Sequence, residues 1–325
     1  MSRPPHVEAE NLFSALIGDG RPLLSLTGLG LILSGGFALF LSATGAFLPH
    51  DIDYLGMTPP ELCAVHECRV VHFMFHDRVS FGGVLIAIGT LYLWLAHFPL
   101  RRGEEWAWWV FFASGLTGFA SFLAYLGYGY LDTWHGAATL ALLPCFLLGM
   151  WKSRVLLPAP RRGPRSLFTP AVPLAWRTRG GFGRLCLLLT GAGKIAGGAV
   201  IMLVGMTTVF VPQDLHYLGL DAAALDALNP RLLPLIAHDR AGFGGGLLSC
   251  GVIVLLVAWK ARIDLVLWQA LLIAGGAGFG CALGVHFAIG YLDAFHLAPA
   301  WLGGAFFVIA MACAFPRKAV PTSGG

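Results

Sequence analysis

An all-α integral membrane protein is the fold class that this sequence predicts, with about eight transmembrane helices arranged as two parallel four-helix repeats. Three observations predict it. Of the 325 residues, 57% are hydrophobic and 12% are charged, and the mean hydropathy is +0.74, far outside the range of soluble domains. Apolar stretches of about 20 residues, long enough to cross a hydrocarbon core, recur along the chain. A set of polar residues also recurs at a nearly constant spacing.

The expected spans follow one another in chain order. We place them at residues 23–47, 78–98, 107–130, 133–151, 185–211, 240–259, 265–290 and 295–315. The domains are then an N-terminal segment at 1–22, a first repeat at 23–151, a linker at 152–183, a second repeat at 184–316 and a tail at 317–325. The first span exceeds the apolar core of a signal peptide and lacks a convincing cleavage site, so we expect it to be retained.

Basic residues mark one side of the membrane. Of the 21 Lys and Arg residues, sixteen fall in segments that are cytoplasmic if the N-terminus is inside, four fall outside, and Lys194 lies within a span. The positive-inside rule therefore predicts a multi-pass protein of the cell (inner) membrane, with both termini cytoplasmic. The net charge of +4 reflects this topology. It does not indicate a nucleic-acid partner, and the expected partner is the lipid bilayer.

An internal duplication underlies the two repeats. His76-Asp77-Arg78 recurs as His238-Asp239-Arg240, an offset of 162 residues. Gly129-Tyr130-Leu131-Asp132 with His135 recurs as Gly290-Tyr291-Leu292-Asp293 with His296, an offset of 161 residues. Each copy contains an even number of expected spans, so both copies would enter the membrane from the same side as parallel repeats.

The repeated polar residues are the candidate functional site, at the outer face. The candidate cofactor-binding residues are His76, Asp77, Arg78, Asp132, His135, His238, Asp239, Arg240, Asp293 and His296. Neutral imidazole ligates Fe, Cu and Zn, so His76, His135, His238 and His296 are the candidate ligands of a metal or haem iron. Aspartate can orient such imidazoles, and Arg can bind a haem propionate. One site per repeat requires His76 to approach His135, and His238 to approach His296.

His286 is a weaker candidate ligand, deep in the seventh expected span, where it could join His238 and His296. A structural interpretation competes with all of these assignments. Asp132 can cap a helix that has His135 in its first turn. Asp77 can lie beside a helix N-terminus, where the helix dipole favours a negative charge. Arg78 and Arg240 can pair with nearby aspartates. Helix capping requires only Ser, Thr, Asn or Asp at the cap position. It does not require a histidine nearby, so it does not explain why the same histidine returns in both copies.

The cysteines divide by location. Cys63 and Cys68 lie in the first outer loop, and we expect a local disulfide between them. The alternative is a metal site with His66 and His72, but the spacing matches no standard zinc pattern. The other five cysteines lie in or beside apolar spans, where they act as small hydrophobic residues.

Three functions remain open at this stage. The first is a redox role in which the duplicated residues bind haem b, a transition metal or quinone, whose released protons His and Asp could accept. The second is a transporter, with Lys194 and His286 as its intramembrane polar groups. The third is a non-catalytic subunit or scaffold of a larger membrane complex. The sequence has no P-loop, G-x-S-x-G or H-E-x-x-H motif, which argues against nucleotide-driven chemistry, and whether the chain is an enzyme stays open.

Overall fold

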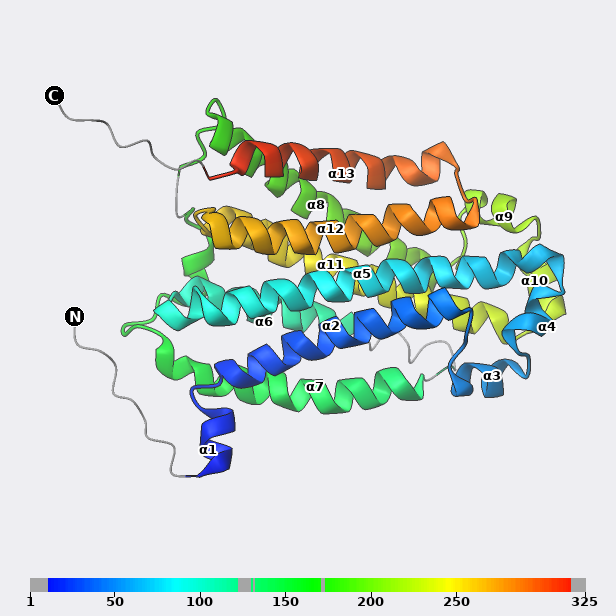
Figure 1. The fold of residues 1–325 in the computed structure, drawn as a ribbon, viewed down its shortest axis with the longest axis horizontal. Helices are drawn as coiled ribbons and strands as arrows, with labels where there is room; N and C mark the ends of the chain where they lie inside the picture. Colours follow the sequence, from blue (N-terminus) through cyan, green and yellow to red (C-terminus); the bar gives the residue numbers. More distant parts are fainter. Residues whose placement is uncertain (1–10, 122–129, 131, 171–172, 317–325) are drawn as a thin grey trace.

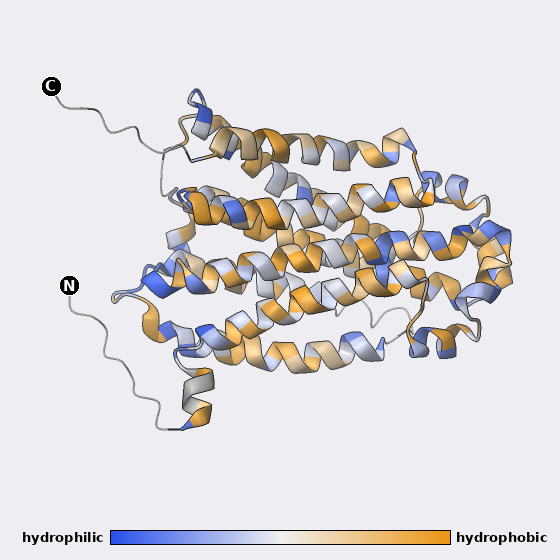
Figure 2. Ribbon diagram, viewed as in Figure 1, coloured by the Kyte–Doolittle hydropathy of each residue, from blue (hydrophilic) through white to orange (hydrophobic). Residues whose placement is uncertain are grey.

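Long apolar helices dominate the described part of the chain. The computed structural model describes residues 11–121, 130, 132–170 and 173–316, and within these ranges it contains no strand. Seven of the described helices are long and apolar enough to cross a membrane, which indicates a multi-pass membrane protein. They run roughly along one direction (Figure 1), and apolar residues predominate over most of their length (Figure 2).

The helices follow the expected order of spans. The α-helices are α1 (Leu12–Ile17), α2 (Arg21–Thr44), α3 (Pro49–Leu55), α4 (Pro59–Cys63), α5 (Arg69–His97), α6 (Glu105–Ser121), α7 (Thr133–Lys152), α8 (Arg179–Met206), α9 (Pro212–Leu218), α10 (Ala222–Leu228), α11 (Leu232–Lys260), α12 (Leu265–Ile289) and α13 (Ala294–Ala314). The third expected span, 107–130, begins in α6 and continues into residues 122–129, which lie outside the described residues, as do 1–10 and the expected tail at 317–325. The eight-span layout and its repeat therefore stay predictions.

Two helices begin eight or nine residues earlier than the sequence predicts, and α8 begins six residues earlier, at Arg179, inside the expected linker. α5 begins at Arg69 and not near residue 78, and α11 begins at Leu232 and not near residue 240. The first turns of α5 and α11 consist largely of buried apolar side chains, so the charged triplets lie inside the two helices and not at their starts. Asp77 thus lies about two turns inside α5. Its expected role at a helix N-terminus is wrong, because the dipole effect fades within the first turn.

α5 and α11 form the centre of the molecule. In their most apolar windows 67% and 72% of the residues are buried, against 17–22% for the other five candidate spans. α5 packs against α2, α11 and α12, whereas α11 packs against α8, α5 and α6. We call residues 11–170 the first half and residues 173–316 the second half. Each central helix thus contacts a helix of the opposite half, α12 or α6, as well as its partner within its own half (Figure 1).

Glycines bring each central helix close to its partner in the same half. A Cβ atom on Gly82 of α5 would lie 2.9 Å from the carbonyl oxygen of Gly35 of α2. In the second half, a Cβ atom on Gly244 of α11 would lie 2.8 Å from the carbonyl oxygen of Gly198 of α8. Small residues permit such close approach between membrane helices. This packing fixes the central helices against α2 and α8.

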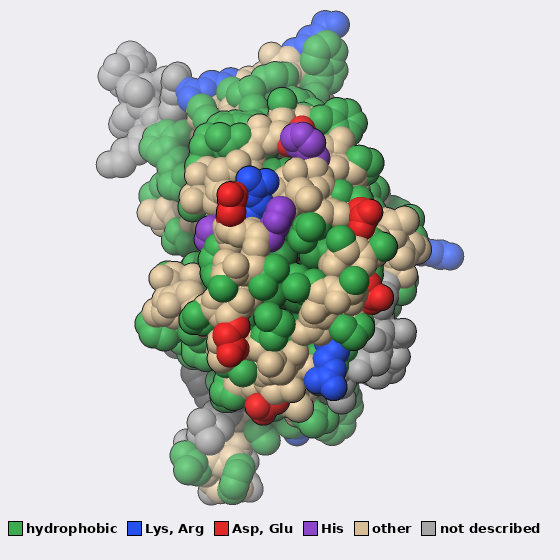
Figure 3. All heavy atoms as spheres, turned by 90° about the vertical axis from the view of Figure 1, so that its right-hand side faces the viewer, with side chains coloured by type: hydrophobic (Ala, Val, Ile, Leu, Met, Phe, Trp, Pro, Cys, Tyr) green, Lys and Arg blue, Asp and Glu red, His purple; other side chains and the backbone are tan. Residues whose placement is uncertain are grey.

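Four short helices cover one end of the bundle. α3, α4, α9 and α10 lie beyond the first turns of α5 and α11, and we call this end the capped end (Figure 1). Viewed from outside, it carries scattered acidic, basic and histidine side chains among apolar ones (Figure 3). Beneath them lies a separate apolar core that includes Leu62, Leu218 and Leu225, all fully buried. The capped end therefore closes the bundle where the sequence predicts only loops.

Candidate functional site

The His-Asp-Arg triplet on each central helix sends its side chains in two directions. An α-helix turns about 100° per residue, so side chains two positions apart face nearly opposite sides. His76 of α5 contacts His286 of α12, whereas Arg78 reaches Asp239 of α11 and Asp51 of α3. α11 repeats this division with His238 and Arg240. Two separate clusters result, both just below the capped end.

The first cluster contains three histidines from three helices. His76, His286 and His296 place one potential ligand atom each within 4.8 Å of the others, and we call them the three-histidine cluster. The Nε2 atoms of His76 and His286 are 2.9 Å apart. The ring of His296 lies 5.8 Å from that of His76 and 5.2 Å from that of His286, centroid to centroid. His76 and His286 are almost completely buried.

The second cluster contains Asp132, His135 and His238, and we call it the two-histidine cluster. Nδ1 of His135 lies 3.4 Å from Nε2 of His238 and 2.9 Å from Oδ2 of Asp132. His50 of α3 adds to it, with Nε2 3.0 Å from Oδ1 of Asp132. At the position of His50 the second half has Gln213. The two clusters therefore resemble each other without being identical.

The expected histidine pairs are both wrong. His76 lies beside His296 and not beside His135, and His238 lies beside His135 and not beside His296. His286 joins His76 and His296, so its expected partnership with His238 is wrong as well. The physical reason is the helix packing, because α12 packs on α5 of the first half. Each cluster is consequently built from both halves of the chain.

Two arginines, the buried Arg240 and the partly buried Arg78, hold the halves together at this level. Arg78 donates to Asp239 at 2.8 Å and to Asp51 at 2.8 Å. Arg240 donates to Asp77 at 3.2 Å and to Asp214 at 2.6 Å. Each guanidinium thus joins one carboxylate of its own half and one of the other. Their expected pairing with nearby aspartates is confirmed, and removing one member of such a buried network typically costs about 3–5 kcal/mol.

Two of the three Nδ1 atoms in the three-histidine cluster have hydrogen-bond partners. Nδ1 of His286 lies 2.5 Å from the carbonyl oxygen of Ala282, and Nδ1 of His296 lies 3.1 Å from the hydroxyl of Tyr291. Nδ1 of His76 lies 3.1 Å from Oδ1 of Asp77, at an angle too poor for a full hydrogen bond. Contacts of this kind to the second ring nitrogen are typical of metal-ligating histidines.

The expected helix cap at Asp132 is confirmed, and Asp293 forms the equivalent cap on α13. Oδ1 of Asp132 accepts from the backbone N–H groups of Trp134 and His135, and Oδ1 of Asp293 accepts from that of His296. Burial alone would raise the pKa of Asp132, but the hydrogen bonds and charge of His135 outweigh it and hold that pKa well below its usual range. Asp132 therefore combines a capping role with a contact to the two-histidine cluster, whereas Asp293 shows the cap alone among the described residues.

Two tyrosines complete the clusters. Tyr130 donates to Asp51 at 2.5 Å, and Tyr291 donates to Asp214 at 2.8 Å. Burial, followed by the adjacent carboxylate, raises the pKa of each tyrosine far above its usual value, so both remain neutral donors. Their recurrence together with Asp51 and Asp214 in both halves is the signal that could have identified them.

Comparisons with protein families, curated proteins and solved structures find no match to this chain. The function must be inferred from the geometry. Haem does not fit between the paired histidines, because axial ligands stand on opposite sides of a porphyrin and these imidazoles contact each other directly at 2.9 and 3.4 Å. The arginines expected to bind propionates are each committed to two carboxylates.

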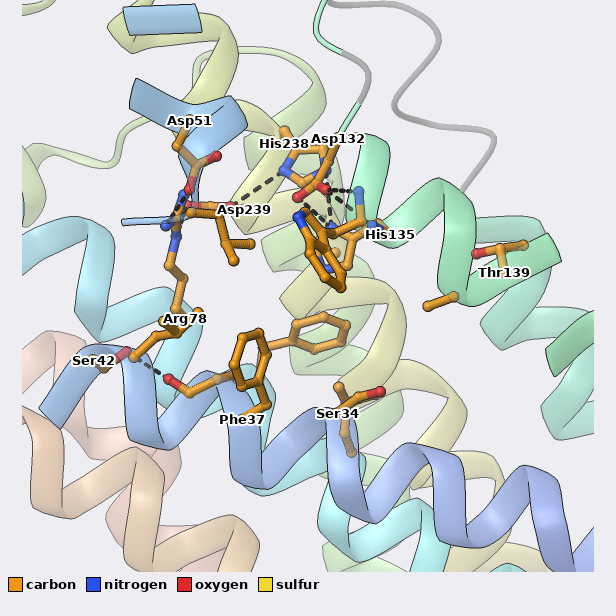
Figure 4. Close-up of a pocket in the computed structure, with 18 of the residues that line it drawn as sticks. Ser34, Phe37, Ser42, Asp51, Arg78, Asp132, His135, Thr139, His238 and Asp239 are labelled. Atoms are coloured by element: carbon orange, nitrogen blue, oxygen red, sulfur yellow. Dashed lines mark hydrogen bonds and ion pairs between the residues drawn. The ribbon is translucent and has the colours of Figure 1, made fainter. Parts of the chain in front are cut away.

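A pocket of about 180 Å³ lies beside the two-histidine cluster. Figure 4 shows His135, His238, Asp132, Asp239, Asp51 and Arg78 around one end, with Phe37 and Ser34 of α2 at the other. Most of its remaining lining is apolar, including Leu31, Leu41, Leu85 and Leu142. The pocket therefore joins an apolar region of the bundle to one of the two polar clusters.

The remaining candidates lie apart from the two clusters. Cys63 and Cys68 are joined in a disulfide, so both sulfur atoms are already committed and the alternative metal site with His66 and His72 does not form. The other five cysteines carry free thiols. The ammonium of Lys194 lies 4.3 Å from the centroid of the Phe279 ring, a cation–π contact inside the bundle.

Proposed function

We propose that this chain is an inner-membrane protein that binds a redox-active transition metal at the three-histidine cluster, with both termini cytoplasmic and the clusters near the outer face. The duplicated four-helix unit belongs to the same proposal. The duplication is supported by equivalent contacts that recur in the two halves. Arg78 and Arg240 each join two carboxylates, and Tyr130 and Tyr291 each donate to an aspartate of their own half.

The contact between His76 and His286 carries the proposal. A carbonyl oxygen can only accept, so Nδ1 of His286 bears the proton and its neutral ring has a lone pair on Nε2. Asp77, facing Nδ1 of His76, favours the same tautomer there. Two lone pairs 2.9 Å apart repel each other unless a cation lies between them. A metal ion or an additional proton would serve, and the third imidazole, His296, favours the metal.

The ligand set limits the choice of metal. Neutral imidazoles suit copper, iron, nickel and zinc, whereas Mg²⁺ and Ca²⁺ prefer oxygen ligands. Zinc has no redox chemistry in proteins, so a redox role requires copper or iron. Asp77 beside His76, and Tyr291 beside His296, would orient the imidazoles and raise their basicity as ligands.

Metal analysis of the purified protein tests the proposal. The wild-type chain is expected to bind about one equivalent of copper or iron, and Cu²⁺ added to the stripped protein should give the electron paramagnetic resonance signal of nitrogen ligation. His286→Phe removes one imidazole and is expected to weaken binding by at least about tenfold, since loss of even an outer contact to a metal ligand typically costs that much.

His216→Ala provides the matched control, because His216 is an exposed histidine of α9 outside both clusters. Its affinity for the metal should equal that of the wild type. A stripped wild-type protein that binds neither metal, or a His286→Phe variant with unchanged affinity, would refute the metal site. A shared proton would then explain the His76–His286 contact, and the transporter and scaffold interpretations would gain weight.

A further inference from the structure

The pocket beside the two-histidine cluster faces the bilayer. Its two outer walls are α2 and α7, whose most apolar windows are only 22% and 17% buried inside the protein. Phe37 on α2 and Trp134 on α7 line the pocket, are 45% and 56% exposed, and have ring centroids 6.4 Å apart. The two rings pack on each other at the lipid-facing rim of the pocket, so a ligand that enters sideways from the lipid would pass beside this pair.

The size of the pocket suits the head of a lipid. Pockets that enclose a whole drug-sized ligand usually measure about 300–1,000 Å³, whereas this one measures about 180 Å³. It can hold one substituted six-membered ring, while a long tail remains among the acyl chains. Phe37, Phe81 and Trp134 line the space and offer the aromatic contacts that a flat ring favours.

The charge at the polar end disfavours an anionic head group. Three carboxylates, Asp51, Asp132 and Asp239, face the single guanidinium of Arg78, so with neutral imidazoles this end carries a net charge of −2. Arg78 already pairs with two of those carboxylates. A phosphate head would be repelled here, whereas a neutral ring with hydroxyl donors would be attracted.

We propose that this pocket binds a lipid-soluble quinol, whose ring hydroxyl donates to the Asp132–His135 pair at the inner end. His135 is the more accessible histidine of the cluster, with 33% of its side chain exposed, whereas His238 is almost completely buried. Asp132 contacts Nδ1 of His135 and would stabilise a positive charge on that ring. The quinol site uses residues other than the three proposed metal ligands and does not depend on them.

Binding of decylubiquinol, a short-chain quinol, tests this inference. The protein is stripped of metal, placed in lipid nanodiscs under anaerobic conditions and titrated, with intrinsic tryptophan fluorescence as the readout. Ala138→Phe on α7 fills the pocket and is expected to weaken binding by about tenfold or more. Ala137→Phe adds the same side chain one residue earlier, at an exposed position outside the lining, and should leave the affinity unchanged.

Two further measurements keep the test independent of folding and of the metal. His135→Gln leaves the pocket open but replaces the imidazole, and should weaken quinol binding by about tenfold, as expected for a hydrogen bond to a charged pair. Dodecyl phosphate should not compete with decylubiquinol.

The inference is wrong if dodecyl phosphate or dodecylammonium displaces the quinol at equal concentration, or if Ala138→Phe and His135→Gln both bind it like the wild type. Because the protein is metal-free, loss of metal binding in the other experiment does not affect this result.

Discussion

Asp132 has two roles that substitutions can separate. It caps α7 through Oδ1 and contacts His135 through Oδ2. Asn caps a helix about as well as Asp, so Asp132→Asn keeps the cap and removes the charge, whereas Asp132→Ala removes both. We expect Asp132→Ala to be less stable than Asp132→Asn by about 0.5–2 kcal/mol. Unfolding in mixed micelles with increasing SDS measures this difference.

The pH dependence of the same variants has a definite sign. The pKa of Asp132 in the folded protein is held below its usual value, which is about 3.9 in an unfolded chain. The charged carboxylate therefore stabilises the fold above that pH, and the stabilisation is lost as the pH falls toward the folded-state pKa. The stability difference between wild type and Asp132→Asn should narrow as the pH falls below about 4. A difference that widens in acid would contradict this assignment.

Single residues explain why the ligands could be predicted but their partners could not. His76 and His238 could be singled out because each recurs with the same neighbours in the other half. The sequence shows the same recurrence, however, whether a histidine contacts another histidine of its own half or one of the opposite half. Only the packing of α12 on α5 distinguishes these arrangements. For the same reason His286, a weak candidate in the sequence, lies at the centre of the three-histidine cluster.

At the scale of the elements, adjacent glycines of α2 provide a matched pair. A Cβ atom on Gly35 would meet the carbonyl oxygen of Gly82 and lie 2.9 Å from Cγ1 of Ile86, whereas a Cβ atom on Gly36 would meet nothing within 4 Å. Gly35→Leu is therefore expected to force α2 away from α5 and to destabilise the protein by about 1–3 kcal/mol. Gly36→Leu should stay within about 0.5 kcal/mol of the wild type. SDS unfolding of both variants checks this, and equal stability would mean that α2 and α5 do not approach closely at Gly35.

The ends of the elements were harder to predict than their existence. Hydropathy alone locates α2, α7, α12 and α13 to within about three residues at each end, because lipid requires long uninterrupted apolar helices, but it misplaces both ends of α8 by five or six residues. It places the start of α5 and α11 too late, since buried charged residues resemble a membrane boundary in sequence. The helices of the capped end are too short, at five to seven residues, for a periodic pattern to reveal them.

The orientation of the whole molecule is still a prediction, and cysteine labelling tests it. Asp226 on α10 is exposed at the capped end, and Arg161 is exposed in the linker at the opposite end. With the termini in the cytoplasm, a membrane-impermeant maleimide should label Asp226→Cys in intact cells. It should label Arg161→Cys only after the cells are permeabilised. The wild-type chain, with its five free cysteines, provides the background, and the reverse pattern would place the capped end in the cytoplasm.

The crossed clusters also bear on how such a chain could arise. The three-histidine cluster takes His76 from the first half and His286 and His296 from the second, and the two-histidine cluster takes His238 from the second half and His135 from the first. If the halves descend from one shorter chain, that ancestor could not have assembled either cluster alone. It would have worked as a homodimer with two identical sites. Fusion of the two copies then allowed each site to change separately, as the pairs His50 and Gln213, and Leu31 and Lys194, illustrate.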